Sequence, residues 1–301
     1  MSKAIQQLIS ASTVCALFAI SVLTPVAAKA SLVNLGTAGP GNYAVLEIGT
    51  GALNISVNAG GLPNGITGNV GLDGSGTLAL TGTTFVQGNV TVAQNVSQVT
   101  LSGAAFISGS ITVNQAALTL ARADALAASA QATFLGTQPG AINLGDVTGP
   151  LHLTTPGVYN INNLNLSQHD KLTLGGGSYV FNVSGDFKIS GDSLKAGVFL
   201  DTGMSASDVL FNYSGIHDIA FSGGGAGDNS QVYGVILSPI QKVSLSPGTV
   251  FGEIIGGNDI SIVSGSDVVG AVPEPATFLA GVLLSLPFGA STLRILRRKT
   301  A

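Results

Sequence analysis

The chain has 301 residues, of which 45% are hydrophobic and 9% are charged, with 42 glycines, one cysteine and no tryptophan. Low charge with high apolar content excludes a disordered chain, and the absence of glycine at every third position excludes collagen. A single cysteine excludes a disulfide scaffold, and a formal charge of −4 argues against binding to nucleic acid. The composition therefore predicts a glycine-rich protein made mainly of β-strands.

Residues 1–30 are typical of a secretory signal peptide. Lys3 precedes an apolar run over 13–23, and Ala28 and Ala30 give the small-x-small pattern before a cut ahead of Ser31. The run is too short to span a membrane, which takes about 20 residues. Cys15 lies inside this segment, so the mature protein is expected to contain no cysteine.

Residues 272–301 combine three features in a fixed order. The residues Val272, Pro273, Glu274 and Pro275 precede an apolar segment over 276–293, which would be about 27 Å long as a helix and would span a membrane. A basic cluster follows, and it is expected to stop transfer and stay on the cytoplasmic side; it consists of Arg294, Arg297, Arg298 and Lys299. A plain C-terminal membrane anchor is the alternative.

This order resembles the PEP-CTERM sorting signal of exosortase substrates. The resemblance implies export through the Sec translocon, transient anchoring in the membrane, and processing at the Pro-Glu-Pro motif by an exosortase-type membrane protease. The mature protein would then lie at the cell surface or outside the cell of a diderm bacterium that makes exopolysaccharide. Between the two ends the chain is acidic: residues 31–275 hold all fifteen acidic residues and five basic ones, a formal charge of −10.

An internal repeat predicts the fold of the body, residues 31–271. Residues 80–94 align without gaps to 101–115, so that Phe85 would lie over Phe106 and Val90-Thr91-Val92 over Ile111-Thr112-Val113. Short β-branched runs between glycine turns at a fixed period are typical of a β-solenoid. We therefore expect a mainly β fold, a right-handed β-solenoid (β-helix), with a β-sandwich as the alternative.

One segment, residues 114–133, departs from this pattern. It is rich in alanine and has no glycine or proline, which predicts a helix with Asn114 as its N-cap. A stripe of small residues would pack the helix along the side of the solenoid: Leu118, Ala121, Ala125 and Ala128, with Leu126 beside them.

Coils, then one helix, then more coils resemble the ice-binding-like β-solenoid architecture, as does the stretch 149–159. Residues 208–213, 234–239 and 252–255 resemble the choice-of-anchor A domain of secreted bacterial surface proteins. The choice-of-anchor A resemblance implies no catalytic residues for this chain.

We find no motif for chemistry. The three histidines are far apart, no C-x-x-C or H-E-x-x-H is present, and residues 223–229 hold one incomplete copy of a calcium-binding glycine repeat. We therefore expect no catalytic residues, no metal site and no cofactor, and scarce aromatic residues argue against a sugar-stacking cleft.

Three functions remain open. The first is a non-enzymatic surface or extracellular-matrix protein with a structural or adhesive role, associated with exopolysaccharide. The second is an ice- or ligand-binding module, which needs a flat face with regularly spaced threonine; the repeat stacks Thr91 and Thr112. The third is a polysaccharide-active enzyme, which needs two carboxylates about 5 to 10 Å apart.

Overall fold

The structure is a computed structural model that describes residues 32–56, 64–191, 195–223, 230–263 and 265–270. These residues belong to one compact unit of the chain, Ser31–Ala301. The signal segment over 1–30, its residues Ala28 and Ala30, and the sorting segment over 272–301 lie outside the described residues. Within the described part, no helix has the length and apolar character needed to cross a membrane.

The described residues form short strands, one α-helix and three 3-10 helices. The first part of the chain holds η1 (Gly36–Ala38), β1 (Val45–Glu47), β2 (Ala52–Ser56), β3 (Gly65–Thr67), β4 (Val70–Leu72), β5 (Thr77–Gly82), β6 (Phe85–Gln87), β7 (Val90–Val92), η2 (Val96–Gln98), β8 (Val99–Gly103), β9 (Phe106–Ile107), β10 (Ile111–Val113) and α2 (Gln115–Gly136). The second part holds β11 (Ile142–Val147), β12 (Leu151–Leu153), β13 (Gly157–Gln168), β14 (Lys171–Leu174), β15 (Tyr179–Val183), β16 (Phe187–Gly191), β17 (Gly197–Leu200), η3 (Ala206–Asp208), β18 (Val209–Tyr213), β19 (Ile219–Ser222), β20 (Ser230–Ser238), β21 (Val243–Ser246), β22 (Gly248–Gly256), β23 (Ile260–Ile262) and β24 (Asp267–Val269).

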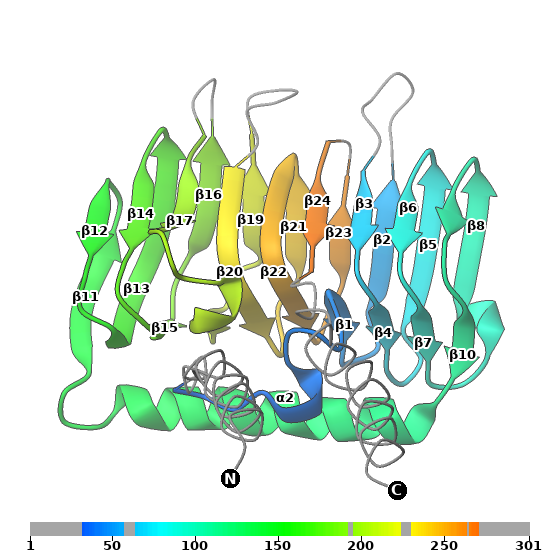
Figure 1. Ribbon diagram of the computed structural model, residues 1–301, viewed down its shortest axis with the longest axis horizontal. Coiled ribbons are helices and arrows are strands. Elements are labelled where there is room, and N and C mark those ends of the chain that lie inside the picture. The colour runs from blue at the N-terminus through cyan, green and yellow to red at the C-terminus, as the bar shows by residue number, and fades with distance from the viewer. Residues whose placement is uncertain (1–31, 57–63, 192–194, 224–229, 264, 271–301) are drawn as a thin grey trace, which may run out of the picture. The chain divides into compact units, whose positions relative to one another are not determined.

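The strands stack as parallel coils with three faces, which confirms the predicted β-solenoid-like arrangement (Figure 1). We name each face after the helix or the side chains that it carries. The helix face runs through β10, β7, β4, β1, the second halves of β22 and β20, β18, β15 and the first half of β13. The serine face runs through β8, β5, β2, β23, β21, β19, β16 and the second half of β13. The aromatic face runs through β9, β6, β3, β24, the first halves of β22 and β20, β17, β14 and β12.

The order of coils along the stack differs from their order in the sequence. The chain starts in the middle at β1 and builds coils outward to the end formed by β8, β9 and β10. Helix α2 then runs back along the stack to its opposite end, where β11 and β12 begin a second series of coils (Figure 1). This second series returns to the middle, where β22 pairs with β1 and β23 with β2. We call this junction of the two series the seam.

The repeat aligned in the sequence is also paired in space. Phe85 pairs with Phe106 at a ring-centroid distance of 6.0 Å, and Val90-Thr91-Val92 pairs with Ile111-Thr112-Val113. Both stacking predictions are confirmed. Because parallel strands lie about 4.8 Å apart, each residue of one coil contacts its counterpart in the next.

Helix α2 covers the helix face, as predicted. Asn114 is its N-cap and accepts a hydrogen bond from the backbone N–H of Ala117, while the helix continues three residues past its predicted end. The predicted stripe is buried, with the exception of Leu126, which is 43% exposed. Placing Leu126 beside the stripe was wrong because its direction on the helix turns it toward solvent.

An asparagine ladder fixes the second half of α2 on the sheet. Asn160, Asn182 and Asn212 occupy paired positions on the helix face. The amide of Asn212 donates to Oδ1 of Asn182 at 2.9 Å, and the amides of Asn182 and Asn160 donate to the helix carbonyls of Ala132 and Gly136. The ladder therefore satisfies polar groups that the helix contact would otherwise bury without partners.

Candidate functional site

The serine face presents two straight columns of outward side chains. Along each strand the inward residues are buried aliphatic or aromatic groups, and the residues between them point to solvent because side chains alternate in a strand. The first column is Thr100, Ala79, Asn54, Ser261, Ser244, Ala220, Lys188 and Asn165. The second column is Ser102, Thr81, Ser56, Ser246, Ser222, Ser190 and Ser167, with Val263 following β23 between Ser56 and Ser246.

Nearly all of these side chains are small, and all of them are exposed or half-exposed. Lys188 is the only charged residue among them, and no aromatic residue is present. Neighbouring strands repeat at about 4.8 Å, and alternate residues of one strand at about 6.6 Å. The serine face therefore offers a regular two-dimensional array of hydroxyl and methyl groups.

The helix face is not available in the same way. It is covered by α2, which contacts β7, β13, β15 and β18, and Thr91 and Thr112 lie on this face. The threonine pair that suggested an open binding face thus stacks as predicted but sits beside the start of the helix.

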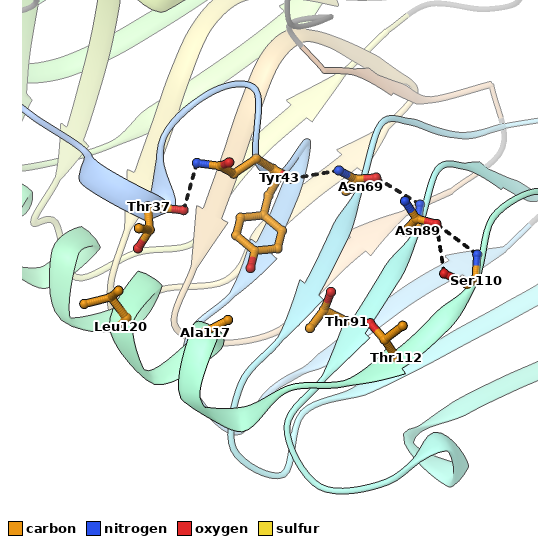
Figure 2. A pocket seen from close by; sticks show the side chains of 10 residues that line it. Thr37, Tyr43, Asn69, Asn89, Thr91, Ser110, Thr112, Ala117 and Leu120 are labelled. Atoms are coloured by element: carbon orange, nitrogen blue, oxygen red, sulfur yellow. Dashed lines mark hydrogen bonds between the residues drawn. The ribbon is translucent and has the colours of Figure 1, made fainter.

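Thr91 and Thr112 help to line a pocket of about 440 Å³ (Figure 2). Its lining includes Tyr43 and a chain of amides at one corner of the coils. Asn69 donates to the carbonyl of Asn42 at 3.0 Å and accepts from the backbone N–H of Asn89, whose own Oδ1 accepts from Ser110. Because these side chains form hydrogen bonds from one coil to the next, this corner aligns successive coils.

The aromatic face carries a stripe of three outward rings. Tyr233 stacks on Phe251 at a centroid distance of 4.4 Å, and Phe199 lies 6.1 Å from Tyr233 on the other side. Lys171 lies 5.2 Å over the ring of Phe199. The loop that contains Met204 closes one side of the stripe and leaves a groove of about 580 Å³. Three aromatic residues therefore form a half-exposed stripe on this face, which composition did not reveal.

The acidic residues are spread over the body. No group of three or more His, Cys, Asp or Glu side chains capable of holding a metal ion occurs within the described ranges. Individual carboxylates have local partners instead. His152 lies 3.0 Å from Asp201, and hydrogen bonds from Lys188 and His217 lower the pKa of Asp186.

Two glutamates at the seam are exceptions, because both are fully buried. Oε1 of Glu47 accepts backbone hydrogen bonds from Gly49 and Gly51, but Oε2 has no partner, and burial raises the pKa of Glu47 to about 7. Both carboxyl oxygens of Glu253 lack partners, and burial raises its pKa well above the usual value. Neither glutamate is among the residues that line the two pockets above, and the burial of both carboxyls bears on stability at the seam.

The fold and its faces define a class: a helix-braced stack of parallel β-coils with one open face of small side chains. The model of the ice-binding-like family matches residues 51–269, and the chain belongs to this family. The match includes the segments that resemble the choice-of-anchor A domain. A search of curated proteins found no match.

Solved structures show the same fold at low identity. An ice-binding protein from the Antarctic ascomycete Antarctomyces psychrotrophicus is 17% identical, with a TM-score of 0.51 over 79% of this chain and 97% of that one. The ice-binding protein 1 domain of Shewanella frigidimarina is 17% identical, with a TM-score of 0.51 over 81% of this chain and 98% of that one. The antifreeze protein LeIBP of an Arctic yeast is 19% identical, with a TM-score of 0.50 over 82% and 98% of the two chains.

Proposed function

We propose that this protein is an ice-binding module and that the serine face is the surface that contacts ice. The observation that carries the proposal is the pair of in-register columns of small side chains on a sheet face that no described helix covers. Water molecules bound to such an array take up the regular spacing of its side chains. Adsorption to a plane of an ice crystal requires a regular spacing of this kind. Family membership and the ice-binding proteins that share the fold support the same conclusion.

The serine face differs from the threonine array expected of such a surface. Serine offers the hydroxyl without the methyl group, so each position orders water with less apolar contact. Lys188 also interrupts the first column with a long charged side chain. We infer that the module holds ice weakly, with a role in attachment to ice or in shaping small crystals.

Placing a bulky ring in the centre of the face should abolish ice binding. Ser222→Tyr on β19 would hold a ring above the array and prevent close approach of a flat crystal surface. Gln87→Tyr, at an exposed position of β6 on the aromatic face, is the matched control. We expect thermal hysteresis and adsorption to an ice hemisphere to be lost in Ser222→Tyr and kept in Gln87→Tyr. Equal activity in the two variants would remove the serine face from consideration.

A second candidate function is that of a surface or matrix protein associated with exopolysaccharide. The groove beside Phe199, Tyr233 and Phe251 favours it, because exposed aromatic edges next to a carboxylate and hydroxyl groups suit contact with sugar rings. Membership of the ice-binding-like family also favours a non-enzymatic role.

We propose in addition that the coils of the solenoid wind right-handedly, since connections between parallel strands almost always do.

We also propose that the chain is exported by the Sec translocon and processed by an exosortase at Pro273, Glu274 and Pro275. Cell fractionation tests export and matrix association together. The wild type should be found in its mature size with the exopolysaccharide fraction, and deletion of 273–275 should leave a longer, membrane-bound form. Tyr233→Ala should be processed normally but shift to the soluble fraction. An unchanged size and location of the deletion variant would contradict the sorting hypothesis.

A further inference from the structure

The end of the stack formed by β8, β9 and β10, which we call the open end, has unpaired strand edges. Among the described residues β8 pairs with β5, β9 with β6 and β10 with β7, and each of the three edge strands has a partner on that side only. Three backbone edges therefore point in one direction away from the body. Such edges readily add further strands.

The core of the solenoid continues to this end, and no segment in the described part of the chain covers it. Leu101 pairs with the fully buried Leu80 but is itself 47% exposed, and Val113 pairs with the fully buried Val92 but is 52% exposed. Phe106 at the rim is 48% exposed. Solenoids normally end in a capping unit with a polar outer surface. The open end instead presents the cross-section of an apolar core.

The strands that form the open end carry no charge and no proline. The sequence contains neither from Gly74 to Ala121, a stretch that covers the last two coils before the helix. The opposite end is different: β11 is broken by register shifts and carries Asp146, and Pro139 and Pro150 flank it. Bulges, charges and prolines of this kind are what natural proteins use to block edge pairing. One end of the stack is therefore protected and the other is not.

We propose that the open end is an interface at which two copies of this chain associate about a two-fold axis. The body is acidic, so most surfaces of two copies repel each other, whereas the open end is neutral and matches itself. A two-fold axis reverses the strand direction across the contact, and the free edges then pair as antiparallel ladders. The protected opposite end stops growth at two copies. The serine face stays uncovered in both.

Cross-linking of the full chain tests this arrangement. Cys15→Ser removes the native thiol, and Ser102→Cys places a single thiol at the open end. Thr154→Cys, exposed beyond β12 at the opposite end, is the matched control. A bismaleimide should convert most of the Ser102→Cys protein to a covalent dimer and leave the Thr154→Cys protein monomeric. Adding Leu101→Lys brings like charges face to face and should reduce the dimer yield by about tenfold or more.

Three results would overturn the proposal. The first is equal, low cross-linking of both single-cysteine variants, which would mean that a terminal segment of the same chain or nothing covers the open end. The second is the formation of cross-linked products larger than a dimer by a variant that carries both Ser102→Cys and Thr154→Cys. Such products would mean head-to-tail assembly. The third is a dimer yield that Leu101→Lys does not change while circular dichroism shows a folded protein.

Discussion

Replacing Phe211 by alanine should lower the free energy of unfolding by about 3 to 5 kcal/mol. Phe211 is fully buried in the second series of coils, where its ring lies 5.1 Å from that of Phe181 and 5.2 Å from that of Phe187. Phe181 pairs with it on the helix face, whereas Phe187 faces it from the serine face. Alanine would leave a cavity between rings that the paired strands hold apart.

Two controls separate this effect from a general sensitivity to lost aromatic area. Phe211→Leu keeps most of the volume and should cost less than about 1.5 kcal/mol. Phe251→Ala removes a half-buried ring of the outward stripe and should cost less than Phe211→Ala because solvent fills its place. Urea unfolding measures all three variants. A loss in Phe211→Ala no larger than that in Phe251→Ala would show that the aromatic core is not closely packed.

The sequence predicted local features well because they rest on local patterns. The ungapped repeat aligned Phe85 with Phe106, and the alanine-rich segment with Asn114 before it defined the helix to within a few residues. Both depend on interactions between residues that are close in the chain or repeat at a constant period.

The position of the seam could not be predicted in this way. Val45 pairs with both Val70 and Ile254, so the first strand lies between coils that are far apart in the sequence. Strands such as β4, β7 and β22 all present similar aliphatic side chains, and any of them could stack on β1. Which strand stacks on β1 depends on where along the stack α2 ends, and this position is a property of the whole fold.

The serine face left a signal that the sequence analysis missed. In most coils a strand ends with two alternate apolar residues followed by serine or threonine, as in Ile219 to Ser222 and Val243 to Ser246. In the sequence alone, stacked threonines are apparent only at Thr91 and Thr112, because the coils differ in length and their equivalent positions become clear only when the strands are paired. The aromatic stripe escaped notice for the same reason, since Phe199, Tyr233 and Phe251 come from three separate coils.

Raising the pH from about 5 to about 8 should destabilise the protein at the seam. The pKa of Glu47 rises from its ordinary value of 4.5 to about 7 on folding, chiefly because burial disfavours the carboxylate, and nearby Asp73 adds to this. A carboxyl with a raised pKa binds its proton more tightly in the folded state. Stability from this group is therefore complete below pH 4.5 and is lost as the pH rises through 7. The loss is on the order of 3 kcal/mol.

Glu253 should add to this loss, because burial raises its pKa well above the ordinary value and neither of its oxygens has a partner. Glu47 and Glu253 lie on β1 and β22, which pair with each other, so their ionisation weakens the contact between the two series of coils. Asp124 has a lowered pKa through its hydrogen bonds from Thr37, and its stabilising effect is lost only as the pH falls through that pKa. It therefore contributes nothing to the change between pH 5 and 8.

Urea unfolding of single variants across this pH range tests the assignment. Glu253→Gln removes the cost of a buried charge, so it should be more stable than the wild type at pH 8 and nearly equal to it at pH 5. Glu47→Gln should flatten the dependence between pH 5 and 7, whereas Asp124→Asn should keep the slope of the wild type. A wild-type stability that stays constant or rises from pH 5 to pH 8 would mean that water or a rearranged side chain solvates these carboxylates at the seam.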